Sequence, residues 1–138
     1  MPEAAKHNTK EGFAAFTQYW LNTVTYAFET GDAKPLTDVS DKSCRVCERF
    51  LQDSETLHSR SGWSVGPRWT VQDFSSDMTT DPHERVLGRF LGVESPSTEY
   101  TSDSVIGRAF PGEPSGTWQE IYAVFGASGW TVAETGNV

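Results

Sequence analysis

The first quarter of the chain carries apolar side chains at helical spacing. They recur every three or four residues on what would be one face of a helix: Phe13, Phe16, Trp20, Val24 and Ala27. This period predicts a long amphipathic helix with one buried stripe. We expect it to begin after an N-cap at Asn8 or Thr9 and to end at Gly31. Gln18 falls on the opposite face, so we expect its removal to change stability little.

Two further helices are predicted before the pattern changes. Pro35 suits the first position of a short helix over 36–39, because its fixed φ matches a helix start. Ser43 is a good N-cap for a third helix that runs to about Ser59, and Gly62 ends it.

From Trp63 onward the helical period gives way to aromatic and β-branched runs, which are typical of strands. The predicted strands cover 68–75, 84–93, 117–125 and 130–133, with a further strand around 104–109. The stretch 126–129 is a strong hairpin connection, and 110–116 is expected to be a loop. The tryptophans of these strands, at 69, 118 and 130, are expected to be mostly packing residues.

Helices followed by an antiparallel sheet predict an α+β fold in which the long helix lies across one sheet face. The order of elements resembles the cystatin-like or nuclear-transport-factor-like cone, with N-terminal helices packed on a curved antiparallel sheet. At 138 residues the chain suits a single domain over 1–138, with a polar lead-in at 1–8 that we expect to be disordered.

Charge excludes some classes of partner. The chain has a formal net charge of −8, and its 11 Lys and Arg residues are scattered along the sequence. Such a chain repels phosphate backbones and anionic lipid surfaces, so we expect no nucleic-acid binding. No apolar run approaches the roughly 18 residues of a membrane-spanning helix.

Four segments of the first half, in order, resemble a known family. They are EAAK at 3–6, FTQYW at 16–20, YAFETGD at 26–32 and CRVC at 44–47. The chain is similar here to a domain family of uncharacterised function found in actinobacterial secreted lipoproteins. The resemblance implies an extracytoplasmic protein held at the cell membrane by a lipid anchor outside this sequence. That family has no agreed catalytic residues, so none can be transferred.

Cys44 and Cys47 are the two cysteines of the chain. In the setting that the resemblance implies, the favoured interpretation is a disulfide between them at the first turn of the third helix. A redox-active pair is the second, because a helix N-terminus lowers the pKa of a thiol. Zinc is the least favoured, because there is no second cysteine pair and His58 lies eleven residues beyond Cys47.

The remaining titratable residues have ordinary roles in this interpretation. We expect the three histidines to be exposed, and acid/base chemistry would need one of them, or a carboxylate such as Asp32, Asp38 or Asp73, in an apolar cleft. Arg85 and Arg89 alternate onto one strand face, with Arg108 near them, and a solvated face is favoured over an anion site.

The sequence therefore favours a non-catalytic, extracytoplasmic domain that binds a small molecule or a cell-envelope protein. We expect no catalytic residue, no metal site and no cofactor. Tyr19 and Tyr26, one heptad apart at the edge of the helical stripe, are the tentative ligand-binding residues. The alternatives are a small cone-fold enzyme of the isomerase or dehydratase type and a thiol redox protein that uses the cysteine pair.

Overall fold

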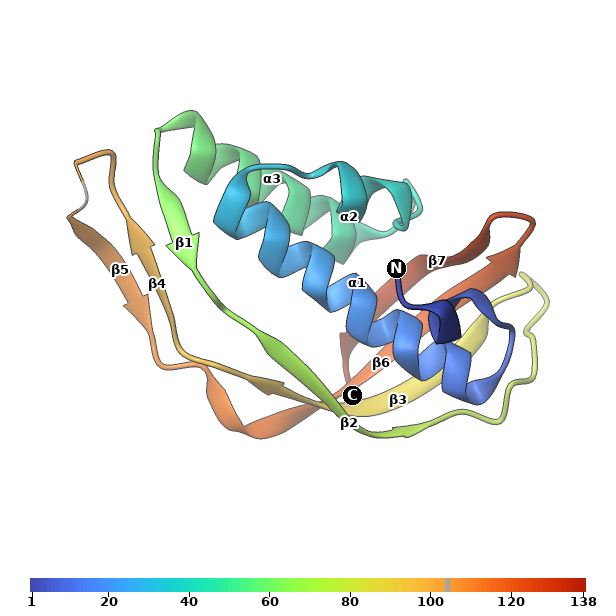
Figure 1. Cartoon of the computed structure of the whole chain (residues 1–138). Helices are drawn as coiled ribbons and strands as arrows, with labels where there is room; N and C mark the ends of the chain where they lie inside the picture. The colour runs from blue at the N-terminus through green and yellow to red at the C-terminus, as the bar shows by residue number, and fades with distance from the viewer. Residues whose placement is uncertain (104) are drawn as a thin grey trace.

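The computed structural model of the protein describes residues 1–103 and 105–138 (Figure 1). A short 3-10 helix, η1 (Glu3–Lys6), precedes three helices: α1 (Lys10–Thr30), α2 (Lys34–Asp38) and α3 (Arg45–Ser59). Seven strands follow: β1 (Trp63–Val65), β2 (Trp69–Ser75), β3 (Val86–Glu94), β4 (Ser97–Tyr100), β5 (Ile106–Phe110), β6 (Glu113–Gly126) and β7 (Gly129–Asn137). The start of the strand predicted at 104–109 falls on residue 104, outside the described residues.

Local signals explain both ends of α1. The Thr9 side chain accepts a hydrogen bond from the Gly12 N–H, which satisfies one of the free donors of the first turn. At the other end Gly31 adopts φ 80°, a left-handed conformation that glycine tolerates, and its N–H donates to the Ala27 carbonyl. The predicted bounds of this helix are confirmed.

The start of α3 differs from the prediction by one residue. Cys44, not Ser43, is the N-cap, and its sulfur accepts a hydrogen bond from the Cys47 N–H at 3.2 Å. Ser43 instead binds Asp41, whose carboxylate accepts from both the backbone N–H and the hydroxyl of Ser43. Asp41 therefore organises the turn before the helix, and Cys44 begins the helix itself.

The strands form two antiparallel sheets that are linked by bent strands. One sheet has the order β2-β3-β6-β7 and the other has the order β1-β4-β5. The chain passes between them at three bends: Gly66–Pro67 between β1 and β2, Ser95–Pro96 between β3 and β4, and Pro111–Gly112 between β5 and β6. Figure 1 shows that the result is one curved surface with the helices on its concave side.

The core lies between α1 and the larger sheet. Its centre is built from the predicted helical stripe together with inward residues of three strands: Phe13, Phe16, Trp20, Val24, Phe90, Ile121, Ala123 and Val132. Trp130 stacks on Phe13 with ring centroids 4.6 Å apart, which adds aromatic contact to the buried area. The α+β cone predicted from the order of the elements is confirmed.

Two predictions are corrected by the packing. Residues 1–8 are not disordered: Ala5 is fully buried, and the His7 carbonyl accepts a hydrogen bond from the Trp130 indole at 3.0 Å. Trp118 is not a core residue, because it pairs with Leu91 on the outer face of the sheet and is 51% exposed. Alternation along β6 places Gln119 and Ile121 inward and Trp118 outward.

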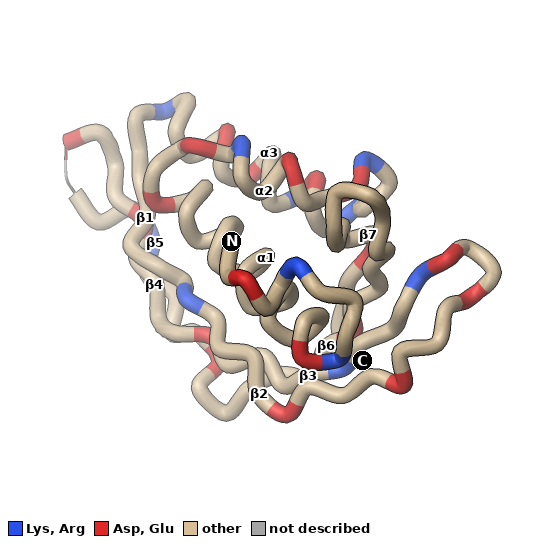
Figure 2. The backbone as a smooth tube through the Cα atoms, turned by 45° about the vertical axis from the view of Figure 1, so that its right-hand side comes forward, with Lys and Arg blue, Asp and Glu red and all other residues tan. Residues whose placement is uncertain are grey.

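Charged residues are spread over the whole surface. Figure 2 shows lysines and arginines interspersed with acidic residues, without a long stretch of one sign. None of the helices in the described ranges is long and apolar enough to cross a membrane.

Candidate functional site

The candidate site is the space between α3 and the concave sheet surface, which we call the α3 cleft. Its inner part, of about 370 Å³, takes Trp20 and Leu21 from α1, Val46, Arg49 and Phe50 from α3, and Trp69, Glu94, Gln119, Thr135, Gly136 and Asn137 from the larger sheet. Its outer part, of about 550 Å³, lies along the second half of α3 and faces β4 and β5. The two parts follow one another along the same helix.

Aromatic rings make the wall of the inner part. Phe50 lies between Trp20 and Trp69, with ring centroids at 6.0 Å and 6.1 Å, and it also meets Phe28 edge-on at 6.3 Å. Trp69 and Phe50 are half-buried, so parts of their rings remain open to solvent. Such surfaces can stack against a planar or apolar group of a ligand.

Glu94 gives the inner part its titratable group. Its Cα pairs with that of Trp69 on one side and with that of Glu113 on the other, at the end of β3 just before the strand bends. Burial raises the pKa of the Glu94 carboxyl; a hydrogen bond from Trp69 opposes this shift, and the charge of Glu113 adds to it. With Gln119 and Arg49, Glu94 supplies both acceptors and donors beside the aromatic wall.

The outer part combines apolar residues with charges of both signs. Phe28 and Leu57 from the helices face Tyr100 and Phe110 from the smaller sheet. Arg108 lies over the Phe110 ring, with its guanidinium carbon 4.9 Å from the ring centroid. This part of the cleft reaches β5, the outer strand of its sheet.

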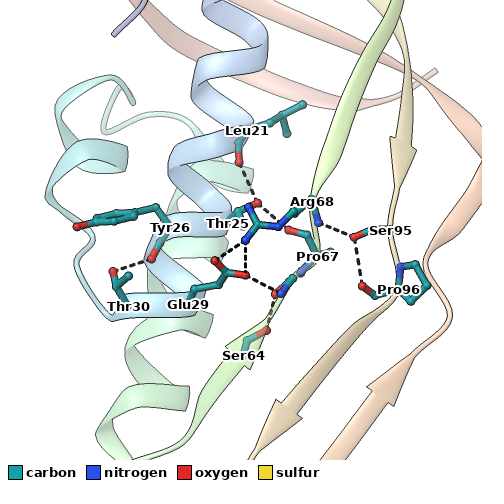
Figure 3. Close-up of polar contacts among 11 residues, drawn as sticks. Leu21, Thr25, Tyr26, Glu29, Thr30, Ser64, Pro67, Arg68, Ser95 and Pro96 are labelled. Atoms are coloured by element: carbon teal, nitrogen blue, oxygen red, sulfur yellow. Dashed lines mark hydrogen bonds and ion pairs between the residues drawn. The ribbon is translucent and has the colours of Figure 1, made fainter.

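A cluster of polar contacts holds α1 against the bend between β1 and β2 (Figure 3). The Glu29 carboxylate accepts from the Gly66 N–H at 2.8 Å and from the Arg68 guanidinium at 2.9 Å, and the Thr25 hydroxyl donates to the Pro67 carbonyl at 2.6 Å. Further along the same edge, the Gln18 amide binds the Trp69 carbonyl and the Val71 N–H at 2.8 Å and 2.9 Å. Side chains of α1 thus bind free backbone groups at the bend between β1 and β2 and in the first half of β2.

The tyrosines named from the sequence lie elsewhere. Tyr19 is half-buried against the core, and Tyr26 is 45% exposed. Figure 3 shows the Tyr26 side chain pointing away from the strands. The residues that line the two parts of the cleft, all within the described chain, include neither tyrosine. From α1 the inner part takes Trp20 and Leu21 instead.

The acid/base candidates lie outside the cleft. Asp32, Asp38 and Asp73 are exposed, and Asp38 pairs with Lys34 at 2.7 Å. A ring nitrogen of the half-buried His58 lies 2.8 Å from the Phe28 carbonyl oxygen. Within the described residues neither part of the cleft is lined by a histidine or a cysteine, and no three His, Cys, Asp or Glu side chains are placed to hold a metal ion.

The three arginines named from the strands do not lie together. Arg85 and Arg89 line one shallow depression, but Arg85 binds Asp81 at 2.8 Å and Arg89 binds Glu120 at 3.2 Å. Arg108 lies on β5 in the other sheet, so the expected proximity to the first two is wrong. The ion pairs agree with a solvated face.

Cys44 and Cys47 form a disulfide, with Cα atoms 5.2 Å apart. Both residues are buried, at 0% and 1% exposure. A redox carrier needs a sulfur that a partner thiol can reach, so this burial favours the structural interpretation. Disulfides persist in oxidising compartments, and the bond therefore suggests an extracytoplasmic environment.

Comparison with known proteins identifies the family. Residues 1–136 match the family of unknown function DUF6318. The chain belongs to this family. No functionally curated protein matches the DUF6318 chain in sequence.

Solved structures share the fold of this DUF6318 domain at low identity. The intermembrane space region of the chloroplast protein ARC6 superposes with a TM-score of 0.63 at 14% identity, covering 94% of this chain and 96% of that one. Aln2 from a Streptomyces species gives 0.52 at 9%, over 92% and 89% of the two chains. A suggested aromatic ring hydroxylase from Novosphingobium aromaticivorans gives 0.52 at 8%, over 88% and 85%. At these identities the likeness concerns the fold alone.

Sequence reasoning placed the tentative ligand-binding residues on the first helix and missed the residues that line the cleft. Nothing in the spacing singled out Glu94 or Gln119. A carboxylate directly before a Ser-Pro bend, after the apolar run 90–93, was the available signal for Glu94.

Proposed function

We propose that this DUF6318 domain is a non-catalytic binding module that takes its ligand in the α3 cleft. One observation carries the proposal: half-buried aromatic rings and a partly buried carboxylate share one solvent-open cleft. Binding sites commonly combine apolar walls with a few polar groups that fix the orientation of the ligand.

The chemistry of the cleft favours a planar group that carries an amide. Trp69 and Phe50 offer ring surface, Glu94 can accept from an N–H, and Gln119 and Arg49 can donate to a carbonyl. A small aromatic amide, or a peptide side chain with its own backbone amide, has these features.

The proposed setting is the outer face of the cell membrane. The buried disulfide suits an oxidising compartment. The resemblance to actinobacterial secreted lipoproteins adds a lipid anchor to this proposed location. The partners would then be small molecules or proteins of the cell envelope.

The lining of the cleft supports an enzyme less well than it supports a binding module. Glu94, with its raised pKa, could act as a base, but the lining of the described chain offers it no histidine partner. Turnover of a substrate that is lost in Glu94→Gln would overturn the non-catalytic proposal.

The test is a screen of small aromatic amides by native mass spectrometry, followed by dissociation constants for two variants. Arg49→Ala, at the cleft, is expected to weaken binding by about tenfold or more, as the loss of one charged hydrogen bond implies. Arg45→Ala is the matched control. Arg45 is exposed like Arg49 and lies one turn before it on α3, but it is absent from the cleft lining in the described chain. Equal effects of the two variants, or no bound amide at all, would contradict the proposal.

A further inference from the structure

The curved sheet has two long edges, and the structure treats them differently. On the β1–β2 edge, side chains of α1 bind backbone groups of the bend and of the first half of β2: Gln18 at Trp69 and Val71, Thr25 at Pro67, and Glu29 at Gly66. An edge strand with unpaired N–H and C=O groups is a template for another strand, and such capping prevents that pairing.

The opposite edge is uncapped. β5 pairs with β4 on one side, and β7 covers β6 from Gln119 onward, with Val138 reaching the Trp118 carbonyl. In the described part of the chain, no strand or side chain binds the outer backbone groups of β5 or of β6 from Glu113 to Thr117. We call this stretch, Ile106–Thr117, the open edge.

Exposed apolar side chains gather at both ends of the open edge. Val105 and Ile106 at its start are 56% and 63% exposed, and Trp118 at its end is 51% exposed. The outer part of the α3 cleft lies directly beside it, with Arg108 and Phe110 of β5 in its lining. A strand added here would lie beside the outer part of the cleft and turn alternate side chains toward the face of the sheet that lines it.

We propose that the open edge binds an extended segment of another polypeptide, which pairs with β5 and the first half of β6 as an added antiparallel strand. This inference rests on the proposed function and names the class of ligand that fills the outer cleft. The added strand continues the line of β7, which is already antiparallel to β6.

Charge distinguishes such a partner from a second copy of this chain. Two β5 strands paired about their centres would set Arg108 against Arg108 of the partner subunit, and like charges directly opposite one another destabilise a sheet. The net charge of −8 adds a general repulsion between copies. The segment that fits is neutral or basic overall but has no Lys or Arg opposite Arg108, and it carries apolar side chains at alternate positions, to pack against Phe110 and Leu57.

The experiment selects random linear peptides, displayed on phage, against the folded protein and measures the affinity of the synthesised winner by fluorescence anisotropy. Ile106→Lys, which places a charge on the open edge, is expected to weaken binding by about tenfold or more. Val65→Lys is the matched control at the other edge, where Val65 is similarly exposed at 55% and directly precedes Gly66, whose N–H Glu29 binds. This variant is expected to change affinity less than about twofold. Both sites are at the surface, so both variants should fold.

Two further readouts identify strand pairing itself. N-methylation of the peptide backbone should abolish binding at every second residue, since alternate N–H groups face the edge. Amide hydrogen exchange in 106–110 should slow by about tenfold or more in the complex. Absence of any selected peptide, equal weakening by both lysine variants, or protection at β1 instead of β5 would overturn the proposal, as would a dimer of the chain that blocks the edge.

The outcome is separable from that of the proposed function. If aromatic amides bind in a way that depends on Arg49, and no peptide binds in a way that depends on Ile106, the binding module is supported and strand addition is refuted. A peptide whose binding needs Ile106, while no amide binds in the inner part, would support strand addition and remove the inner part as a site for aromatic amides.

Discussion

At the scale of single residues, Gln18 acts in the place of a neighbouring strand. Its amide both donates to and accepts from the β2 backbone, at Trp69 and Val71. Gln18→Ala leaves these two backbone groups without their partners, so we expect it to lower the free energy of unfolding by about 1 to 3 kcal/mol. A urea melt measures the loss. This corrects the expectation from helical phase, which assigned Gln18 no role.

Gln52→Ala is the control for Gln18→Ala. Gln52 is an exposed helical glutamine whose side-chain amide donates to Glu48 on its own helix, at 3.2 Å. Its loss should change stability by less than about 0.5 kcal/mol. Similar losses for the two variants would show that Gln18 does not hold the β2 edge.

Glu94 links stability to pH. Because its folded pKa is raised, the favourable contribution of the neutral carboxyl is complete below the unfolded pKa and is lost as pH rises through the folded pKa. Glu94→Gln, which stays neutral, should therefore raise the melting temperature relative to the unaltered protein at pH 7. At pH 3 the advantage should disappear. An equal shift at both pH values, in differential scanning fluorimetry, would contradict a titrating Glu94.

The disulfide joins residues three apart, so it closes a very short loop. Its contribution to stability should lie at the low end of about 0 to 5 kcal/mol. The double variant Cys44→Ser with Cys47→Ser keeps a side-chain acceptor at the N-cap position and should still fold at room temperature. Circular dichroism of an unfolded double variant would refute this, and alkylation of both thiols in protein made without reductant would refute the bond.

At the scale of elements, the stripe of α1 is the main source of burial in the core. Trp20 is 2% exposed, packs against Phe50, and donates from its indole to the Ser40 hydroxyl at 3.0 Å. Trp20→Ala should cost about 3 to 5 kcal/mol through lost burial and a residual cavity. A denaturant melt with a loss below that of Gln18→Ala would contradict the observed phase of the helix.

Helices and the middle parts of the long strands were predictable because their periods extend over many residues. The Thr9 cap and the Gly31 stop were readable for the same reason, as each is a local choice of one residue type. The expected loop at 110–116 was wrong from Glu113 onward, where β6 begins, and β7 extends past the predicted end to Asn137.

β1 and β4 were missed because three or four residues carry too little alternation to be recognised. The bends at Pro67, Pro96 and Gly112 were hidden too, since each depends on how adjacent strands curve together.

At the scale of the whole molecule, the helices lie differently against the two long edges of the sheet. α1 covers one long edge of the sheet with its polar side chains, whereas α3 stands beside the other edge across a cleft (Figure 1). The sequence predicted the cone and named Tyr19 and Tyr26 as tentative ligand-binding residues. It could not show which helix lines the cleft, because the positions of Tyr26, Trp69 and Glu94 depend on contacts between segments far apart in the chain.

The central claim is that the α3 cleft is the binding site, and the indole N–H signals of the five tryptophans test it most directly. In a titration of nitrogen-15-labelled protein with the best aromatic amide from the screen, the Trp69 signal should move with a saturable curve. The Trp130 signal, from an indole buried in the core and bound to the His7 carbonyl, should stay in place. Saturable binding that leaves Trp69 unmoved and shifts other signals would contradict the account.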